Sequence, residues 1–275
     1  MERPNESCAL QITEVLTVNF KPYRKDYEFS YTLGMFPTIE MLHSVPEKIV
    51  RVVFSSQYQP SPDSPDVQTM CNDYHIPWTV NDRLIDKLSP KENCYLLGIF
   101  RKYEKPVRPD ENHIILCRPG NLGNLGTILR TALGFNYRDI VIIRPAADLF
   151  DPKTIRSSMG ALFKLNFSFF SSLEEYTQHF EHDIYAFRLN GEEPLEHAVH
   201  LGNKPHYSLL FGNESSGLLA DESTYGTGVV IPHSSFIDSL NLPTAVGIAL
   251  YEFSKGSFDE EVGVWGEHDV TNVTY

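Results

Sequence analysis

Short apolar runs separated by helix-like stretches are the feature that most constrains the C-terminal part of this chain. Such runs occupy residues 113–117, 139–144, 165–171, 184–189, 207–212 and 227–232. The stretches between them, at 126–135, 152–163, 172–180 and 239–254, have a helical pattern. Strands that alternate with helices predict a mostly parallel sheet with helices on both faces. In such sheets ligands bind beyond the carboxyl ends of the strands.

The N-terminal part has a second, smaller α/β pattern. We expect helices at 33–45, 66–74 and 81–89, and strands at 48–56, 76–80 and 94–103. Residues 105–112 are charged and contain two prolines, which is typical of a domain junction. The predicted organisation is an extension at 1–25, a domain at 26–106, a second domain at 110–256 and an acidic tail at 257–275.

Composition places the chain among globular proteins and excludes several classes. The 275 residues are 41% hydrophobic and 21% charged. No apolar run approaches the roughly 20 residues that span a bilayer, and the N-terminus lacks a basic-then-apolar leader. We therefore expect a cytoplasmic protein that does not associate with membranes. Its four cysteines are scattered without a CxxC pair, which argues against a disulfide framework or a structural metal.

The charge is strongly and unevenly acidic. The formal net charge is −13, of which residues 106–275 carry −11 and residues 1–105 only −2. Such a balance gives no general attraction to nucleic acid. An RNA ligand would therefore be held by local basic clusters. The last 20 residues contain five acidic side chains and no basic one, a pattern typical of a solvated chain end.

Three loops contain the candidate chemistry. Residues 118–135 follow a strand and open a helix; Gly120, Gly123 and Gly126 allow tight turns and close backbone approach, and Arg130 lies about one turn into that helix. Residues 211–218 place Glu214 just past a buried strand, where it could cap, face solvent, or accept hydrogen bonds from a ligand or a neighbouring loop. Residues 231–253 offer Ser239 as a helix N-cap before an apolar helix rich in small residues. Each loop alone has an ordinary structural explanation.

The combination of these loops resembles the three sequence motifs of the SpoU/TrmH family, in the SPOUT class of RNA methyltransferases. The resemblance covers residues 112–254. It rests on Asn124, Gly126, Arg130 and Ala132, on Gly-Asn-Glu-x-x-Gly-Leu at 212–218, and on Ile-Pro…Ser-Leu-Asn…Ala at 231–245. Upstream, residues 31–56 resemble the start of the L30e-like RNA-binding domain that many members carry.

The resemblance implies a fold and a cofactor. Family members form an α/β sheet whose C-terminal segment threads through a loop as a deep trefoil knot, a rare topology. The cofactor is S-adenosyl-L-methionine. By position in the motifs, Gly212, Asn213, Ile231 and Leu240 would bind it, largely through backbone groups.

The resemblance also implies methyl transfer to a ribose 2′-OH. The residues carried over as catalytic are Arg130, Asn124, Glu214, Ser239 and Asn241. An arginine is a difficult base because its pKa exceeds 12, so we expect Arg130 to bind phosphate and stabilise the alkoxide. The base is then a phosphate oxygen or water. We expect Glu214 to hold Asn124 or Asn241, or the ribose itself.

The implied partners are RNA and a second copy of the chain. Members with an L30e-like domain often modify rRNA, so rRNA is favoured over tRNA, with Lys153 and Arg156 as candidate phosphate contacts. No metal is expected. One alternative is a non-catalytic RNA-binding or ribosome-assembly factor on the same fold. Another is a nucleotide-dependent oxidoreductase, which the absence of GxGxxG with a following acidic residue disfavours.

Overall fold

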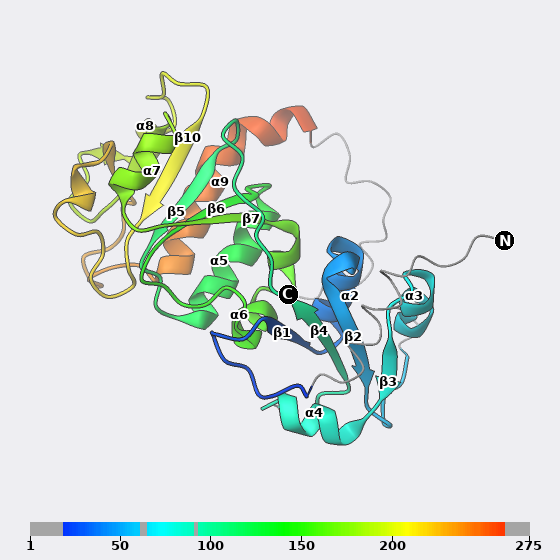
Figure 1. Cartoon of the computed structure of the whole chain (residues 1–275). Helices are drawn as coiled ribbons and strands as arrows, with labels where there is room; N and C mark the ends of the chain where they lie inside the picture. The colour runs from blue at the N-terminus through cyan, green and yellow to red at the C-terminus, as the bar shows by residue number, and fades with distance from the viewer. Residues whose placement is uncertain (1–18, 61–64, 91–92, 262–275) are drawn as a thin grey trace. The chain divides into compact units, whose positions relative to one another are not determined.

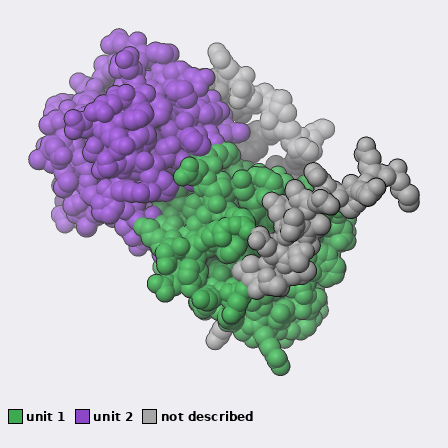
Figure 2. Space-filling model, in the orientation of Figure 1, with its two compact units in different colours: residues 1–105, 125–130, 148–165 green, residues 106–124, 131–147, 166–275 purple. Residues whose placement is uncertain are grey.

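The computed structural model describes residues 19–60, 65–90 and 93–261 (Figure 1). They form two compact units (Figure 2). Unit 1 comprises residues 1–105, 125–130 and 148–165, and unit 2 comprises 106–124, 131–147 and 166–275. Most of the predicted extension and tail, residues 1–18 and 262–275, lies outside the described residues. Because each unit takes several chain segments, the contiguous domain boundaries expected from the sequence stay a prediction.

Unit 1 contains a four-stranded mixed sheet in the order β1-β4-β2-β3. Its strands are β1 (Phe29–Leu33), β2 (Ile49–Phe54), β3 (Trp78–Val80) and β4 (Leu96–Arg101). β4 is antiparallel to β1 and β2, and β3 is parallel to β2. Its helices are α2 (Met35–Ser44), η1 (Pro46–Lys48), α3 (Val67–Asp73), α4 (Asp82–Leu88), α6 (Pro152–Ser157) and η2 (Ala161–Lys164). These strands, except β1, were predicted from the sequence pattern.

The sheet of unit 1 is covered on both faces. On one face Val53 packs with Ile85 and Leu88 of α4. On the other, Val52 and Phe54 pack with side chains of α2 and α3. Phe20, within the predicted extension, is buried against the α4 face. Burial of alternate side chains on both faces is what a two-sided apolar strand such as β2 requires.

Unit 2 contains a seven-stranded sheet in the order β7-β6-β5-β10-β8-β11-β9. The strands are β5 (His113–Cys117), β6 (Asp139–Ile143), β7 (Asn166–Phe170), β8 (Asp183–Phe187), β9 (Glu193–Pro194), β10 (Tyr207–Phe211) and β11 (Thr227–Val230). All six pairings are parallel. The predicted parallel α/β sheet is therefore confirmed. The two-residue β9 and the short α8 (Leu195–Ala198) were not predicted, and the knot stays a prediction.

Helices cover both faces of this sheet. The helices of unit 2 are α7 (Leu173–His179), α8, η3 (Glu222–Thr224), α9 (Leu242–Glu261) and the two ends of α5 (Leu122–Gly134), whose residues 125–130 belong to unit 1. Leu173 and Tyr176 of α7 pack on alternate strand residues that include Val141 and Leu210. On the opposite face, the ring of Phe253 in α9 contacts the aromatic rings of β8 and β10.

The long helix α9 differs from the prediction at both ends. It begins at Leu242, so Ser239 is not its N-cap, and the Ala245 N–H donates to the carbonyl of Asn241. The reason is Pro243, which is tolerated in a first turn but would disrupt the interior of a helix that started at Ser239. At the other end α9 continues to Glu261, beyond the predicted end at residue 254.

Candidate functional site

A pocket of about 470 Å³ lies at the carboxyl ends of three adjacent strands of unit 2. Its walls come from the segments that follow β8, β10 and β11, and from the start of α9. The apolar part of the lining consists of Phe187, Leu189, Phe211, Leu218, Val229, Val230, Ile231, Leu240, Leu242 and Ala245. Loop backbone, serines and amides supply the polar part, together with Arg188, Glu214 and His233. This is where the sequence analysis expected a ligand, and the volume lies in the range of small-molecule sites.

The loop after β10 is a tight turn that needs glycine at its entrance. A Cβ added to Gly212 would lie 2.2 Å from the carbonyl carbon of Gly217 and 2.3 Å from the backbone N of Leu218. Asn213 and Gly217 exchange two backbone hydrogen bonds of 3.0 Å. The side-chain oxygen of Asn213 accepts from the backbone N–H of Ser215 at 2.9 Å. The turn therefore brings loop backbone to the pocket wall with no side chain at Gly212 in between.

Hydrogen bonds to the carboxylate of Glu214 join the loop after β10 to the loop after β5. Its carboxylate accepts hydrogen bonds from the backbone N–H groups of Gly120 at 3.0 Å and Asn121 at 3.1 Å. The side-chain amides of Asn124, at 3.4 Å, and Asn213, at 3.3 Å, also donate to it. Burial raises the pKa of this carboxyl, but the hydrogen bonds, chiefly those from backbone N–H groups, outweigh it and lower the pKa below its ordinary value.

The contact between Glu214 and Asn124 is one of those that the sequence analysis expected. No hydrogen bond joins Glu214 to Asn241 in the described part of the chain. A half-buried carboxylate just past a buried strand therefore joins two loops that are about 90 residues apart in sequence.

Helix α5 begins four residues earlier than predicted. The side chain of Asn121 caps it, accepting from the backbone N–H groups of Gly123 at 2.8 Å and Asn124 at 3.0 Å. Arg130 consequently lies about two turns into the helix, where one turn was expected. It is exposed, about 9 Å along the axis from Asn124 and about 120° around it. The true start of the helix was not predicted, because the glycines of this stretch were read as part of a loop, although Asn121 is a strong capping residue.

A buried ion pair that the sequence analysis missed supports the same two loops. Arg118, whose φ of 52° is in the left-handed region, forms an ion pair with Glu222, whose side chain is only 7% exposed. Its second guanidinium nitrogen donates to Glu222 at 2.9 Å, and its carbonyl accepts from the side chain of Asn213 at 2.7 Å. The hydrogen bond with Glu222 raises the pKa of Arg118. Sequence periodicity cannot pair charges 104 positions apart.

The structure brings some of the predicted residues together and leaves others apart. Gly212, Asn213, Glu214, Ile231, Ser239 and Leu240 line the pocket. Asn241, immediately before α9, is exposed and does not line it. Lys153 and Arg156 are exposed on α6 of unit 1.

In residues 19–60, 65–90 and 93–261, no group of three or more His, Cys, Asp or Glu side chains could hold a metal ion. Within the same ranges, no helix has both the length and the apolar character needed to cross a membrane.

Comparison with known proteins decides the family. The sequence profile described as the SpoU rRNA Methylase family matches residues 111–251. The chain belongs to the SpoU rRNA methylase family. The match includes the loops joined by Glu214 and the start of α9, and it confirms the resemblance found from the sequence motifs.

Individual relatives agree with this assignment. A 23S rRNA (uridine(2479)-2'-O)-methyltransferase from Streptomyces viridochromogenes is 33% identical over 161 residues, 54% of this chain and 53% of that protein. A 23S rRNA (adenosine(1067)-2'-O)-methyltransferase from Streptomyces azureus is 25% identical over 265 residues, 90% of this chain and 93% of that protein. The alignment with the first of these spans about half of its length.

A solved SpoU methyltransferase from Streptomyces viridochromogenes, in complex with AdoMet, has the same fold. Its TM-score is 0.72 at 22% identity, and the match covers 91% of this chain and 98% of that structure. At this identity the likeness concerns the fold, and it includes both α/β parts of the chain.

Proposed function

We propose that this SpoU family member is an S-adenosyl-L-methionine-dependent methyltransferase that modifies a ribose 2′-OH of RNA. The observation that carries the proposal is the pocket at the carboxyl ends of β8, β10 and β11, fastened by Glu214 to the start of α5. The names of the relatives described above support transfer to the 2′-oxygen. They also favour rRNA as the substrate class.

The pocket fits the cofactor in size and chemistry. Apolar side chains such as Ile231 and Leu240 suit an adenine ring, and backbone groups of the loop beginning at Gly212 and Asn213 suit its polar edges. The buried Nε of Arg188, also in the wall, has no hydrogen-bond partner among the described residues. When bound, S-adenosyl-L-methionine would supply a methyl group already activated on a sulfonium.

The residues around the pocket are suited to positioning the loops and the reacting groups. Glu214 accepts two backbone hydrogen bonds and has a lowered pKa, so in this proposal it anchors the loops and does not take the proton. It also orients the amide of Asn124. Arg130 remains a cation, able to bind a phosphate and to stabilise the developing alkoxide. The base is a phosphate oxygen or water.

The remaining assignments complete the proposal. Ser239 and Asn241 flank the third motif and would position the ribose. Lys153 and Arg156, both exposed cations, would contact RNA phosphates. We place the enzyme in the cytoplasm as a homodimer, without a metal ion, and we assign residues 26–106 to substrate binding and 110–256 to methyl transfer.

The proposal is tested by methyl transfer from labelled S-adenosyl-L-methionine to separate pools of unmodified rRNA and tRNA. We expect label in rRNA, and transfer reduced at least 100-fold in Arg130→Ala, the cost typical of removing one transition-state donor. The matched control is Arg138→Ala, which removes another exposed arginine. Binding of RNA without cofactor binding or transfer would contradict the proposal and favour a non-catalytic factor.

A further inference from the structure

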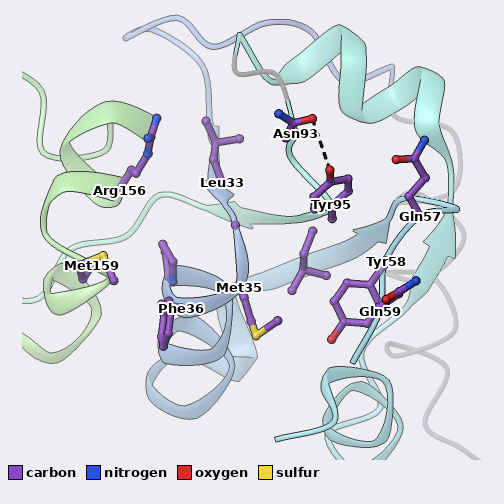
Figure 3. Close-up of a pocket in the computed structure, with 13 residues that line it drawn as sticks. Leu33, Met35, Phe36, Gln57, Tyr58, Gln59, Asn93, Tyr95, Arg156 and Met159 are labelled. Carbon is purple, nitrogen blue, oxygen red and sulfur yellow. Dashed lines mark hydrogen bonds between the residues drawn. The ribbon is translucent and has the colours of Figure 1, made fainter. Parts of the chain in front are cut away.

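Unit 1 contains a second pocket, of about 810 Å³, that the proposed reaction does not use (Figure 3). The end of β1 contributes Leu33 to its wall, and four further parts of unit 1 contribute as well. They are the first turn of α2, the segment after β2, the start of β4, and the end of α6 with the turn that follows. Every described residue in the wall belongs to unit 1, so we treat the pocket as a feature of that unit.

Aromatic side chains stand exposed beside an apolar floor. Leu33 and Leu96 are buried in the floor. Phe36 is 61% exposed and Tyr95 is 42% exposed, although both line the cavity. Large aromatic faces left to water beside a cavity are typical of binding surfaces. The pocket thus offers ring faces to a flat partner.

The rest of the rim is polar and carries a positive charge. Gln57, Gln59 and Asn93 are exposed amides, and the hydroxyl of Tyr95 donates to the side-chain oxygen of Asn93 at 3.4 Å (Figure 3). Arg156 is the only charged residue among those described in the wall. Its side chain is exposed and forms no ion pair with a described residue. The described residues of the wall include no carboxylate, in contrast with the chain's net charge of −13.

We propose that this pocket binds an unstacked nucleobase of the RNA substrate, at a site separate from the methylated nucleotide. The base would stack on Phe36 and Tyr95, its polar edge would meet the amides, and the adjoining phosphodiester would pair with Arg156. Stacking on aromatic rings beside a cation is how proteins hold single-stranded nucleic acid. The positive rim favours a polyanion over an acidic or neutral peptide. The inference rests on the proposed function, since it takes RNA as the substrate.

Binding of unmodified rRNA by the full-length protein tests the pocket, measured at one fixed salt concentration. Loss of one stacked base weakens binding roughly 5- to 150-fold, so we expect a change in this range for Phe36→Ala and for Tyr95→Ala. Phe36→Trp should bind within about threefold of the wild type because it keeps a ring. The control is Tyr74→Ala, which removes a 45% exposed aromatic ring of the same unit outside the pocket. Equal melting temperatures would show that the variants fold.

Arg156 provides an independent measurement. Arg156→Ala should reduce the slope of log K against log salt by about one, the signature of one lost phosphate contact, whereas Phe36→Ala should leave the slope unchanged. In rRNA containing 4-thiouridine, a photocrosslink at Phe36 or Tyr95 would place a base in the pocket directly.

The outcomes separate this inference from the proposed function. A wild-type protein that neither binds nor methylates RNA would overturn both. If the wild type methylates rRNA while Phe36→Ala and Tyr95→Ala bind it normally, with no crosslink in the pocket, only the pocket assignment fails. An effect of Phe36→Ala on binding to intact ribosomal subunits but not to naked rRNA would overturn it as well, in favour of a protein partner.

Discussion

Removing the Glu214 carboxylate should loosen the candidate site without unfolding the sheet. In the wild type the backbone N–H groups of Gly120 and Asn121 donate to the Glu214 carboxylate at 3.0 and 3.1 Å. In Glu214→Ala both groups lose this acceptor. Hydrogen bonds to a charged group contribute about 1.5–3 kcal/mol each. Glu214 is only half-buried and both N–H groups belong to exposed residues, so water replaces part of this energy. We expect a loss of about 2 kcal/mol in the free energy of unfolding.

Thermal unfolding and turnover measure the two consequences. A loss of about 2 kcal/mol lowers the melting temperature by roughly 4–8 °C in a domain of this size. Turnover should fall more than tenfold because the start of α5 is no longer held against the pocket. Glu214→Gln keeps an acceptor oxygen and should lose about half as much stability. A Glu214→Ala protein that melts and turns over like the wild type would refute the anchoring role.

The pH dependence supplies a further check on Glu214. Its pKa is lowered in the folded protein, so the stability it contributes is present above its unfolded pKa and is lost as pH falls through the folded value. Glu214→Gln should therefore show a weaker decline in stability on the acid side than the wild type. The matched control is Glu175→Gln, which removes a partly exposed carboxylate of α7 that also accepts a backbone hydrogen bond. It should leave turnover unchanged.

Three further changes probe the framework around the site. Gly126→Ala should lower the free energy of unfolding by about 1–3 kcal/mol in thermal unfolding, because the added Cβ would lie 1.9 Å from a serine hydroxyl of α6. The control Gly134→Ala should be neutral or stabilising, because nothing lies within 4 Å of its added Cβ. Glu222→Gln should cost about 3–5 kcal/mol in urea unfolding because it leaves Arg118 without its buried partner, and an unchanged midpoint would contradict this. Burial lowers the pKa of His113 from 6.5 to about 4. The free energy of unfolding should therefore decline by roughly 3 kcal/mol as pH falls from 6.5 to 4. A free energy of unfolding that stays constant over this pH range would contradict this.

Much of the fold of unit 2 could be predicted because most of its longer strands are rich in apolar residues, with uninterrupted apolar runs at 114–117 in β5 and at 140–143 in β6. Strands β5 and β6 are buried at every position, and the run of apolar residues reports that directly. Strand β1 escaped prediction because Ser30 and Thr32 interrupt its apolar pattern, although both are buried. Their hydroxyls are satisfied by tertiary hydrogen bonds, to the carbonyl of Phe150 and to Thr38, which local sequence does not reveal.

The candidate site, too, could be predicted from the sequence only in part. The motif order placed Glu214 and Asn124 in one site, and their hydrogen bond is present. The pairing of Arg118 with Glu222 could not be foreseen, because it depends on two loops meeting at neighbouring strand ends. Gly126 was expected to allow a tight turn or a close backbone approach, and the structure shows the second, because Gly126 lies inside α5 where a side chain would clash with α6. Close packing and turn formation both require glycine, and only the structure distinguishes them.

The measurement that tests the central claim most directly is the position of the transferred methyl group. RNA methylated by the wild-type protein with labelled S-adenosyl-L-methionine would be digested with alkali, which cleaves beside a free 2′-OH and leaves a 2′-O-methylated nucleotide joined to its neighbour. We predict label in dinucleotides from rRNA, and its loss in Arg130→Ala. Label in mononucleotides alone would mean that the enzyme methylates a base and would contradict the ribose assignment.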